Sequence, residues 1–197
     1  MMIIGLSGKK GSGKTTIRKE ICRVVGQHRP IAHFAFADEI KRIAIEVMGL
    51  PAQFVHGTDE QKNTTLTSYQ WESMPFKNDK KGLMTVREVL QVIGTEIFRT
   101  MDPNIWLKVM YRKIMALDKP EYWTVVIDDC RFENEIDFVR NLGGRTYKLT
   151  RFAGQTSDTH VSEATLDDSY YHLLVDNNKL NIEEAARLII DDSDLYS

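Results

Sequence analysis

The stretch that decides the fold is Met-Ile-Ile-Gly-Leu-Ser-Gly-Lys-Lys-Gly-Ser-Gly-Lys-Thr-Thr, residues 2–16. Its apolar start, residues 2–6, predicts a short buried strand, and apolar residues recur at helical spacing after it. The turn between these two segments matches the phosphate-binding P-loop pattern G-x-x-x-x-G-K-[ST] at Gly8, Gly13, Lys14 and Thr15. A strand before the turn and a helix after it are the context that separates this motif from a chance match. The stretch therefore predicts a nucleoside triphosphate site.

Each residue type in this motif has a physical reason. Glycine lets the backbone bend so that consecutive N–H groups point at phosphate oxygens, and the helix that follows adds its positive N-terminal end. Lys14 is expected to reach the β- and γ-phosphates, and the Thr15 hydroxyl to bind Mg²⁺. The residues predicted to bind ATP are Gly8, Lys10, Gly11, Ser12, Gly13, Lys14, Thr15 and Thr16.

The composition excludes several classes of protein. With 197 residues the chain is long enough for one domain with a substantial core. Its 26 basic and 28 acidic residues give a net charge of -2, which argues against nucleic-acid or membrane partners. Cys22 and Cys130 lack metal-ligand spacing and are expected to be buried thiols in a reducing compartment. The sequence shows no signal-peptide pattern and no long apolar run, so we expect a cytoplasmic protein.

Strand-like and helix-like patterns alternate along the chain. Strands are predicted at 2–6, 31–36, 123–127, 145–149 and 172–175. After the helix that follows the P-loop, further helices are predicted at 38–48, 85–99, 102–117, 133–142 and 181–190. Such alternation predicts an α/β fold, a three-layer P-loop NTPase fold with a mostly parallel five-stranded sheet and helices on both faces. The tail, residues 191–197, is expected to be frayed.

Three helix starts carry capping signals. Thr85 precedes Glu88 by three residues, and Asn181 stands in the same relation to Glu184, which is the capping-box spacing. Pro103 follows Asp102 and is expected at the first helical position.

Residues 50–84 are polar, interrupted by Gly57, Pro75 and Gly82, and only weakly periodic. Two interpretations stay open, a surface loop or a functional excursion over a site, because a connection this long is uncommon in a compact domain. We expect residues 1–197 to form a single domain with 50–84 as an excursion at the acceptor site.

Ligands of parallel sheets bind at the carboxyl ends of the strands. This rule predicts one crevice that contains the P-loop, Asp38, Asp129, Arg131 and Arg151. Two acids, Asp128 and Asp129, stand at the end of the strand predicted at 123–127. We expect Asp129 to support Mg²⁺ and Asp128 to cap the next turn.

Arginines border the predicted crevice. Guanidinium groups bind phosphate oxygens bidentately and hold an acceptor phosphate in line for transfer. Each arginine taken alone is more readily a solvated surface charge than a ligand, except Arg131, which comes two residues after the strand-end acid Asp129. The candidates are Arg42, Arg87, Arg99, Arg131 and Arg151, and composition alone adds Lys62, His160 and Glu163 more weakly.

Six stretches of the chain, in order, resemble the bacteriophage deoxynucleoside monophosphate kinases. They are residues 5–16, 36–42, 58–63, 87–96, 129–135 and 160–163. The P-loop is common to many families, whereas R-E-x-L-Q-x-x-G-T-E and D-x-R-F-x-N-E are much more specific. The resemblance implies phosphorylation of a deoxynucleoside monophosphate with ATP and Mg²⁺, a fold like that of nucleoside monophosphate kinases, a homodimer, and action in the host cytoplasm.

The resemblance also implies roles for individual residues. The catalytic residues would be Lys14, Asp129, Arg131 and Arg151, and the metal ligands Thr15 and Asp129. The substrate-binding residues would be Asp38, Arg42, Lys62, Arg87, Gln91, Thr95, Arg99, Arg131, His160 and Glu163. Residues 151–163 would form a lid that keeps water from the transferring phosphoryl group.

Other functions stay open. The chain would also suit a kinase of another small phosphate ester, phosphomevalonate-like, or a non-catalytic ATP-binding regulatory module. A kinase of nucleic-acid ends is disfavoured because the sequence has no basic stripe. The sequence does not say which base is accepted.

Overall fold

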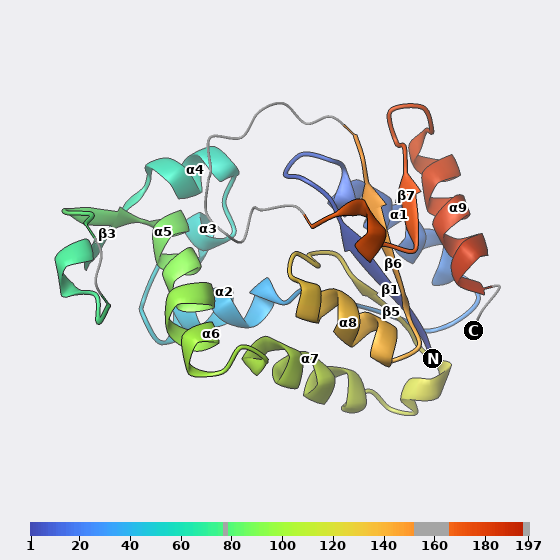
Figure 1. The fold of residues 1–197 in the computed structure, drawn as a ribbon, viewed down its shortest axis with the longest axis horizontal. Helices are drawn as coiled ribbons and strands as arrows, with labels where there is room; N and C mark the ends of the chain where they lie inside the picture. Colours follow the sequence, from blue (N-terminus) through green and yellow to red (C-terminus); the bar gives the residue numbers. More distant parts are fainter. Residues whose placement is uncertain (77–78, 152–165, 195–197) are drawn as a thin grey trace. The chain divides into compact units, whose positions relative to one another are not determined.

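The computed structural model describes residues 1–76, 79–151 and 166–194, and the chain divides into two compact units (Figure 1). The first unit comprises Met1–Phe36 and Leu107–Ser197, and the second comprises Ala37–Trp106. The expectation of a single domain stays a prediction.

The first unit is built on a parallel sheet whose strand order is β2-β5-β1-β6-β7. Its strands are β1 (Met2–Ser7), β2 (Ile31–Phe34), β5 (Thr124–Ile127), β6 (Arg145–Leu149) and β7 (Leu173–Val175). β1 is central, with Ile4 beside Val126 of β5 and Gly5 beside Thr146 of β6, both in parallel register. The predicted five-stranded parallel sheet of an α/β fold is confirmed.

Helices cover both faces of this sheet, which is why every residue of β1 is buried. On one face, Ile4 and Leu6 pack with α1 (Lys14–Val25) and α9 (Ile182–Asp194), which lie side by side in Figure 1. On the other face, Gly5 lies against Val139 of α8 (Glu133–Asn141), where an added Cβ would come within 3.2 Å of that side chain. The alternating directions of successive side chains in β1 therefore produce the layered architecture.

Helix α9 is longer than the sequence pattern indicates. It continues to Asp194, because the Asp192 carboxylate accepts hydrogen bonds from the Tyr147 hydroxyl at 2.7 Å and from Arg145 at 2.9 Å. The prediction that residues 191–194 are frayed is wrong, and residues 195–197 lie outside the described part. The helix start is as predicted, because the Asn181 and Glu184 side chains each accept the other's backbone N–H at 2.9 Å.

The second unit is mainly helical and has its own core, which includes Val55, Trp71, Met84, Val89 and Ile93. Its elements are α2 (Ala37–Glu46), α3 (Ala52–Val55), α4 (Asp59–Thr64), β3 (Leu66–Gln70), η1 (Trp71–Ser73), β4 (Leu83–Thr85), α5 (Val86–Gln91), η2 (Val92–Ile97) and α6 (Phe98–Met101).

The segment 50–84 has more regular structure than a surface loop. It contains two short helices and the antiparallel hairpin of β3 and β4. These elements are hard to read in the sequence because α4 buries none of its residues and is instead stabilised by a capping box between Thr58 and Gln61. The surface-loop interpretation is wrong, and a role at the acceptor site stays a prediction.

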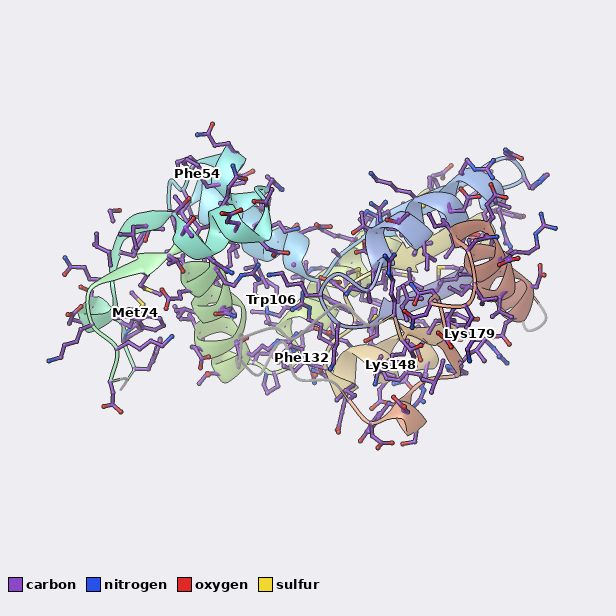
Figure 2. The ribbon with its side chains drawn as sticks, turned by 90° about the horizontal axis from the view of Figure 1, so that it is seen from above. Phe54, Met74, Trp106, Phe132, Lys148 and Lys179 are labelled. Atoms are coloured by element: carbon purple, nitrogen blue, oxygen red, sulfur yellow. The ribbon has the colours of Figure 1, made fainter. Side chains whose placement is uncertain are left out.

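The predicted helix 85–99 is present but changes its hydrogen-bonding period in the middle. The Thr85–Glu88 capping box starts it as expected, and η2 is a π-helical segment. The carbonyl of Gly94 in η2 accepts a hydrogen bond from the Trp106 indole N–H at 2.8 Å, and a Cβ at Gly94 would come 2.8 Å from Ile40. Trp106 is labelled in Figure 2.

Helix α7 (Ile105–Met115) begins two residues later than Pro103, the predicted first helical residue. The Asp102 side chain accepts a hydrogen bond from the Asn104 backbone N–H at 3.0 Å. Asp102 therefore stabilises the turn before the helix and does not cap the helix itself. Among residues 1–76, 79–151 and 166–194, none of the helices combines the length and apolar character needed to cross a lipid bilayer.

Candidate active site

The turn after β1 has the backbone conformation of a phosphate-binding loop. Gly8, Gly11 and Gly13 have φ angles of 138°, 77° and 92°, a region that other residues rarely adopt. At Gly8 a Cβ would also come 2.7 Å from the backbone oxygen of Leu149 on β6. These three positions therefore require glycine for reasons of geometry.

Lys14 lies across this loop. It is the first residue of α1, which begins after Gly13 without a side-chain cap. Its ammonium group donates hydrogen bonds to the backbone oxygens of Gly8 at 2.5 Å and Lys9 at 2.9 Å. Thr15 and Thr16 follow in the first turn of the helix. Uncapped N–H groups at a helix start together with a lysine are suited to bind phosphate.

Ser12 is fully buried inside the loop. Its carbonyl accepts a hydrogen bond from the Asn177 side chain at 2.7 Å. Its hydroxyl oxygen has no hydrogen-bond partner within the described residues. Since buried hydroxyls are nearly always hydrogen-bonded, this group is available to a ligand. Lys10 and Gly11 complete the predicted ATP-binding stretch.

Asp128, at the end of β5, forms an ion-pair network. Its carboxylate lies 2.9 Å from Arg18 Nε on α1 and 3.1 Å from His33 Nε2 on β2. Burial raises the pKa of Asp128, but the hydrogen bond and charge of His33 and the charge of Arg18 outweigh it, so the pKa lies below its usual value. The expectation that Asp128 caps the next turn is wrong, because its partners lie on other elements.

Asp129 follows β5 in the chain. Its carboxylate accepts a hydrogen bond at 2.8 Å from the backbone N–H of Phe36, which lies two residues after the end of β2. A carboxylate and a threonine hydroxyl are hard oxygen ligands of the kind that Mg²⁺ prefers. Such sites typically use one or two carboxylates and complete the shell with substrate phosphates and water. The described part of the chain contains no cluster of three or more histidine, cysteine or acidic side chains. The two predicted ligands, Thr15 and Asp129, have the oxygen chemistry that suits Mg²⁺ bound together with phosphate.

The turn that carries Arg131 is fixed by Glu135. The backbone N–H groups of Arg131 and Phe132 donate to Glu135 Oε2 at 2.7 and 3.1 Å, and Glu135 is only 2% exposed. Phe132 is labelled in Figure 2. This explains why the D-x-R-F-x-N-E stretch ends in an acid. The role of Glu135 was missed in the sequence, because the N-cap is Phe132 and only the glutamate half of the capping-box pattern is present.

Both cysteines of the chain are free thiols. Cys130 is buried between Asp129 and Arg131, and burial raises its pKa well above the ordinary value. Cys22 on α1 is only partly buried, so the expectation of two buried thiols holds for Cys130 alone.

Two side chains hold the backbone after β6. The Arg151 N–H donates to the Asn177 side-chain oxygen at 2.9 Å. Lys148, labelled in Figure 2, donates to the backbone oxygen of Leu166 at 3.1 Å and to Asp168 at 2.5 Å. The rest of the predicted lid, including His160 and Glu163, falls outside the described residues.

In the second unit, two of the predicted substrate-binding arginines make ion pairs. Arg42 lies 2.7 Å from both Glu39 and Glu46 on its own helix and is 53% exposed on its side chain. The Arg87 guanidinium, 17% exposed, pairs with Asp59 and donates to Asn63 at 2.7 Å. The structure thus joins two of the resembling stretches, residues 58–63 and 87–96.

The other acceptor-side candidates are spread over several elements of the second unit. Arg99 on α6 donates to the Pro103 carbonyl at 3.5 Å. Asp38 is on α2, Lys62 on α4, Gln91 at the end of α5 and Thr95 in η2. Asp129, Arg131 and Arg151 share the first unit with the P-loop, and each follows a strand of the same parallel sheet. That Asp38 joins them in one crevice stays a prediction.

The profile of one protein family, Deoxynucleotide monophosphate kinase, matches residues 46–187. The chain belongs to the deoxynucleotide monophosphate kinase family. A protein of Acanthamoeba polyphaga mimivirus with the provisional name deoxynucleotide monophosphate kinase is 34% identical over 202 residues, which cover 96% of this chain and 95% of the relative. The resemblance found in the sequence is confirmed.

Two further comparisons extend this family assignment. The deoxynucleoside-5'-monophosphate kinase of Escherichia phage T5 is 26% identical over 182 residues, which cover 71% of this chain and 72% of the phage protein. Among solved structures, shikimate kinase from Aquifex aeolicus covers 100% of both chains with a TM-score of 0.50 and 13% identity. That likeness concerns the fold alone, and it agrees with a P-loop kinase architecture for this family member.

Proposed function

We propose that this protein is a deoxynucleoside monophosphate kinase. It transfers the γ-phosphoryl group of ATP to the 5'-phosphate of a deoxynucleoside monophosphate and yields the diphosphate and ADP. The observation that carries the proposal is the P-loop of the first unit, where three left-handed glycines and an uncapped helix start surround Lys14 in a chain of this family.

ATP binds through its phosphates at the P-loop. The Lys14 ammonium exchanges the backbone oxygens of Gly8 and Lys9 for the β- and γ-phosphate oxygens, which are stronger acceptors because they are charged. The buried Ser12 hydroxyl has room for a hydrogen bond that the described residues do not supply. The P-loop backbone is in place before ATP arrives, so apart from the change of partners at Lys14 little reorganisation opposes binding.

Thr15 and Asp129 would hold Mg²⁺. When bound, the ion neutralises charge on the β- and γ-phosphates. The Phe36 N–H fixes the Asp129 carboxylate at the carboxyl ends of the parallel strands, where the P-loop also begins.

The acceptor phosphate is held by the arginines of the second unit, with Arg42, Arg87 and Arg99 as its partners and Asp38, Lys62, Gln91 and Thr95 completing the acceptor site. A phosphate oxygen of the acceptor attacks the γ-phosphorus of ATP while the bond to the β–γ bridging oxygen breaks, and ADP leaves. Arg131 and Arg151 stabilise the charge on the transferring group, which is worth most in a site closed to water.

The test is ADP formation from ATP and Mg²⁺ with a panel of acceptors. The panel holds the four common deoxynucleoside monophosphates, dUMP, the ribonucleoside monophosphates, phosphomevalonate and a control without acceptor. Strong stimulation by one or more deoxynucleotides supports the proposal and reveals the preferred base. ATP binding without stimulation by any nucleotide would contradict it.

Action in the host cytoplasm and assembly as a homodimer stay predictions of the family resemblance. Sedimentation of the purified protein tests the second of these, since a monomer at assay concentration would contradict it.

A further inference from the structure

Asn177 lies at the end of β7 and connects two parts of the candidate active site. Its side-chain nitrogen donates to the Ser12 carbonyl in the P-loop at 2.7 Å, and its side-chain oxygen accepts the Arg151 N–H at 2.9 Å. We propose that Asn177 is a positioning residue that sets the phosphate-binding loop and the backbone of Arg151 relative to each other. The proposal rests on the function proposed above.

The two bonds require the chemistry of an amide. Ser12 offers an acceptor and Arg151 offers a donor, so the bridging side chain must donate with one atom and accept with the other. An aspartate in this place would accept only. The Asn177 backbone is itself held, because its N–H donates to the Val175 carbonyl at 3.0 Å and Thr150 donates to the same oxygen at 3.0 Å. The half-buried amide is therefore fixed at both ends.

The bond to Ser12 determines the direction of a P-loop N–H. Ser12 and Gly13 share a trans peptide unit, in which the carbonyl and the N–H point in opposite directions. With the carbonyl held toward Asn177, the Gly13 N–H points away from it. Gly13 is the residue before α1, with a φ of 92°, and its N–H belongs to the set that faces phosphate in such loops. Asn177 thereby orients one phosphate-binding donor before ATP arrives.

The bond to Arg151 extends the same control to the exit of β6. Arg151 is the second residue after the strand, and its N–H is held by the same side chain that holds the P-loop. The position of the Arg151 backbone relative to the ATP phosphates thus depends on one amide. Residues 176–181 lie outside the six resembling stretches, so this role comes from the structure alone.

The test compares three variants of the full-length protein. Asn177→Ala removes both bonds, and Asn177→Asp keeps the acceptor for Arg151 but turns an oxygen toward the Ser12 carbonyl. Asn178→Ala is the matched control, because the neighbouring Asn178 is exposed and its side chain bonds to Asp176. The measurements are ATP affinity without acceptor, kcat with the preferred deoxynucleotide, and the unfolding temperature.

We expect Asn177→Ala to lose about tenfold in ATP affinity and about tenfold in kcat, the size of one or two lost hydrogen bonds. Asn177→Asp should lose at least as much ATP affinity, while Asn178→Ala matches the wild type. In an Arg151→Ala background, Asn177→Ala should keep its effect on ATP affinity but lose most of its effect on kcat.

Three results would overturn the proposal. They are wild-type ATP affinity in Asn177→Ala, wild-type activity in Asn177→Asp, or a lowered unfolding temperature as the only change. If Asn177→Ala lowers kcat as much in the Arg151→Ala background as it does in the wild type, the link to Arg151 is refuted. Because ATP affinity is measured without acceptor, a failure of the proposed kinase reaction is seen separately, as no stimulation of the wild type by any nucleotide.

Discussion

The two units of the chain hold the groups proposed to bind phosphate in different ways. In the first unit, backbone geometry carries the site, and the groups around the P-loop are fixed by Asn177, Glu135 and the Phe36 N–H. In the second unit, side chains carry it, and the arginines Arg42 and Arg87 are neutralised by neighbouring carboxylates. The proposed ATP site of the first unit therefore has a preorganised backbone, whereas in the proposed acceptor site of the second unit a phosphate would replace carboxylates.

This difference predicts which kinetic constant each unit controls. The ion pairs of Arg42 are exposed and contribute little stability, so a phosphate can replace their carboxylates at small cost. Backbone N–H groups fixed in the P-loop need no exchange. Variants of the first unit should change ATP binding and the chemical step, and variants of the second should change the KM of the acceptor.

The largest effect is expected for Lys14→Ala. Loss of the ammonium that reaches the β- and γ-phosphates should lower kcat by roughly 1,000-fold, as for loss of a strong charge-stabilising donor. Initial rates of ADP formation measure it. Lys19→Ala, an exposed residue of the same helix, is the control and should match the wild type. A near-normal rate for Lys14→Ala would remove the P-loop from the mechanism.

Arg131→Ala should lower kcat by about 100-fold with a small change in the KM for ATP, because its charge acts on the transferring group. Arg112→Ala, at an exposed position of α7, serves as the control. Steady-state kinetics with both substrates varied separates the two constants. A change confined to the KM for ATP would show that Arg131 binds ATP and has no part in transfer.

Arg87→Ala should raise the KM for the acceptor by about tenfold and leave the KM for ATP unchanged, since one charged hydrogen-bonding partner is lost. The matched variant Arg42→Ala compares an arginine paired within its own helix with one paired to α4. If either variant weakens ATP as much as the acceptor, the proposed division of labour between the two units fails.

Asp128→Asn tests an ion pair of the first unit and should have the smallest effect, about 1 kcal/mol of stability at neutral pH. The folded pKa of Asp128 lies below the ordinary value of 3.8, so its contribution is present above that value and is lost as pH falls through the folded pKa. Urea unfolding of both proteins at several pH values measures it. A difference that grows below pH 3.8 would contradict the assigned direction.

The sequence predicts the first unit well because its signals are local. The P-loop pattern, the apolar strand before it and the alternation of strands and helices all reappear in the sheet around β1. The tail of α9 was misjudged because its stability comes from Asp192, whose partners on β6 lie more than forty residues away. Such pairings leave no local pattern.

The site was predicted unevenly for the same reason. Residues that follow strands, such as Asp129 and Arg131, could be placed from topology. Arg18, His33 and Asn177 could not, because their partners come from other elements and no spacing rule links them. In the segment 50–84, short elements with little buried surface lack the periodicity on which sequence interpretation depends.

The π-helical segment η2 has a consequence for how this region can vary. One π turn holds about one residue more than an α turn, so η2 acts as a single-residue insertion absorbed inside a helix. The extra residue rotates the helical turn that follows, α6 with Arg99, by about 100° about the helix axis relative to α5. A relative one residue shorter here would keep Arg87 in place and direct its counterpart of Arg99 elsewhere. Changes in helical phase at η2 therefore offer a route to a different acceptor preference without any substitution in the residues proposed to bind the acceptor.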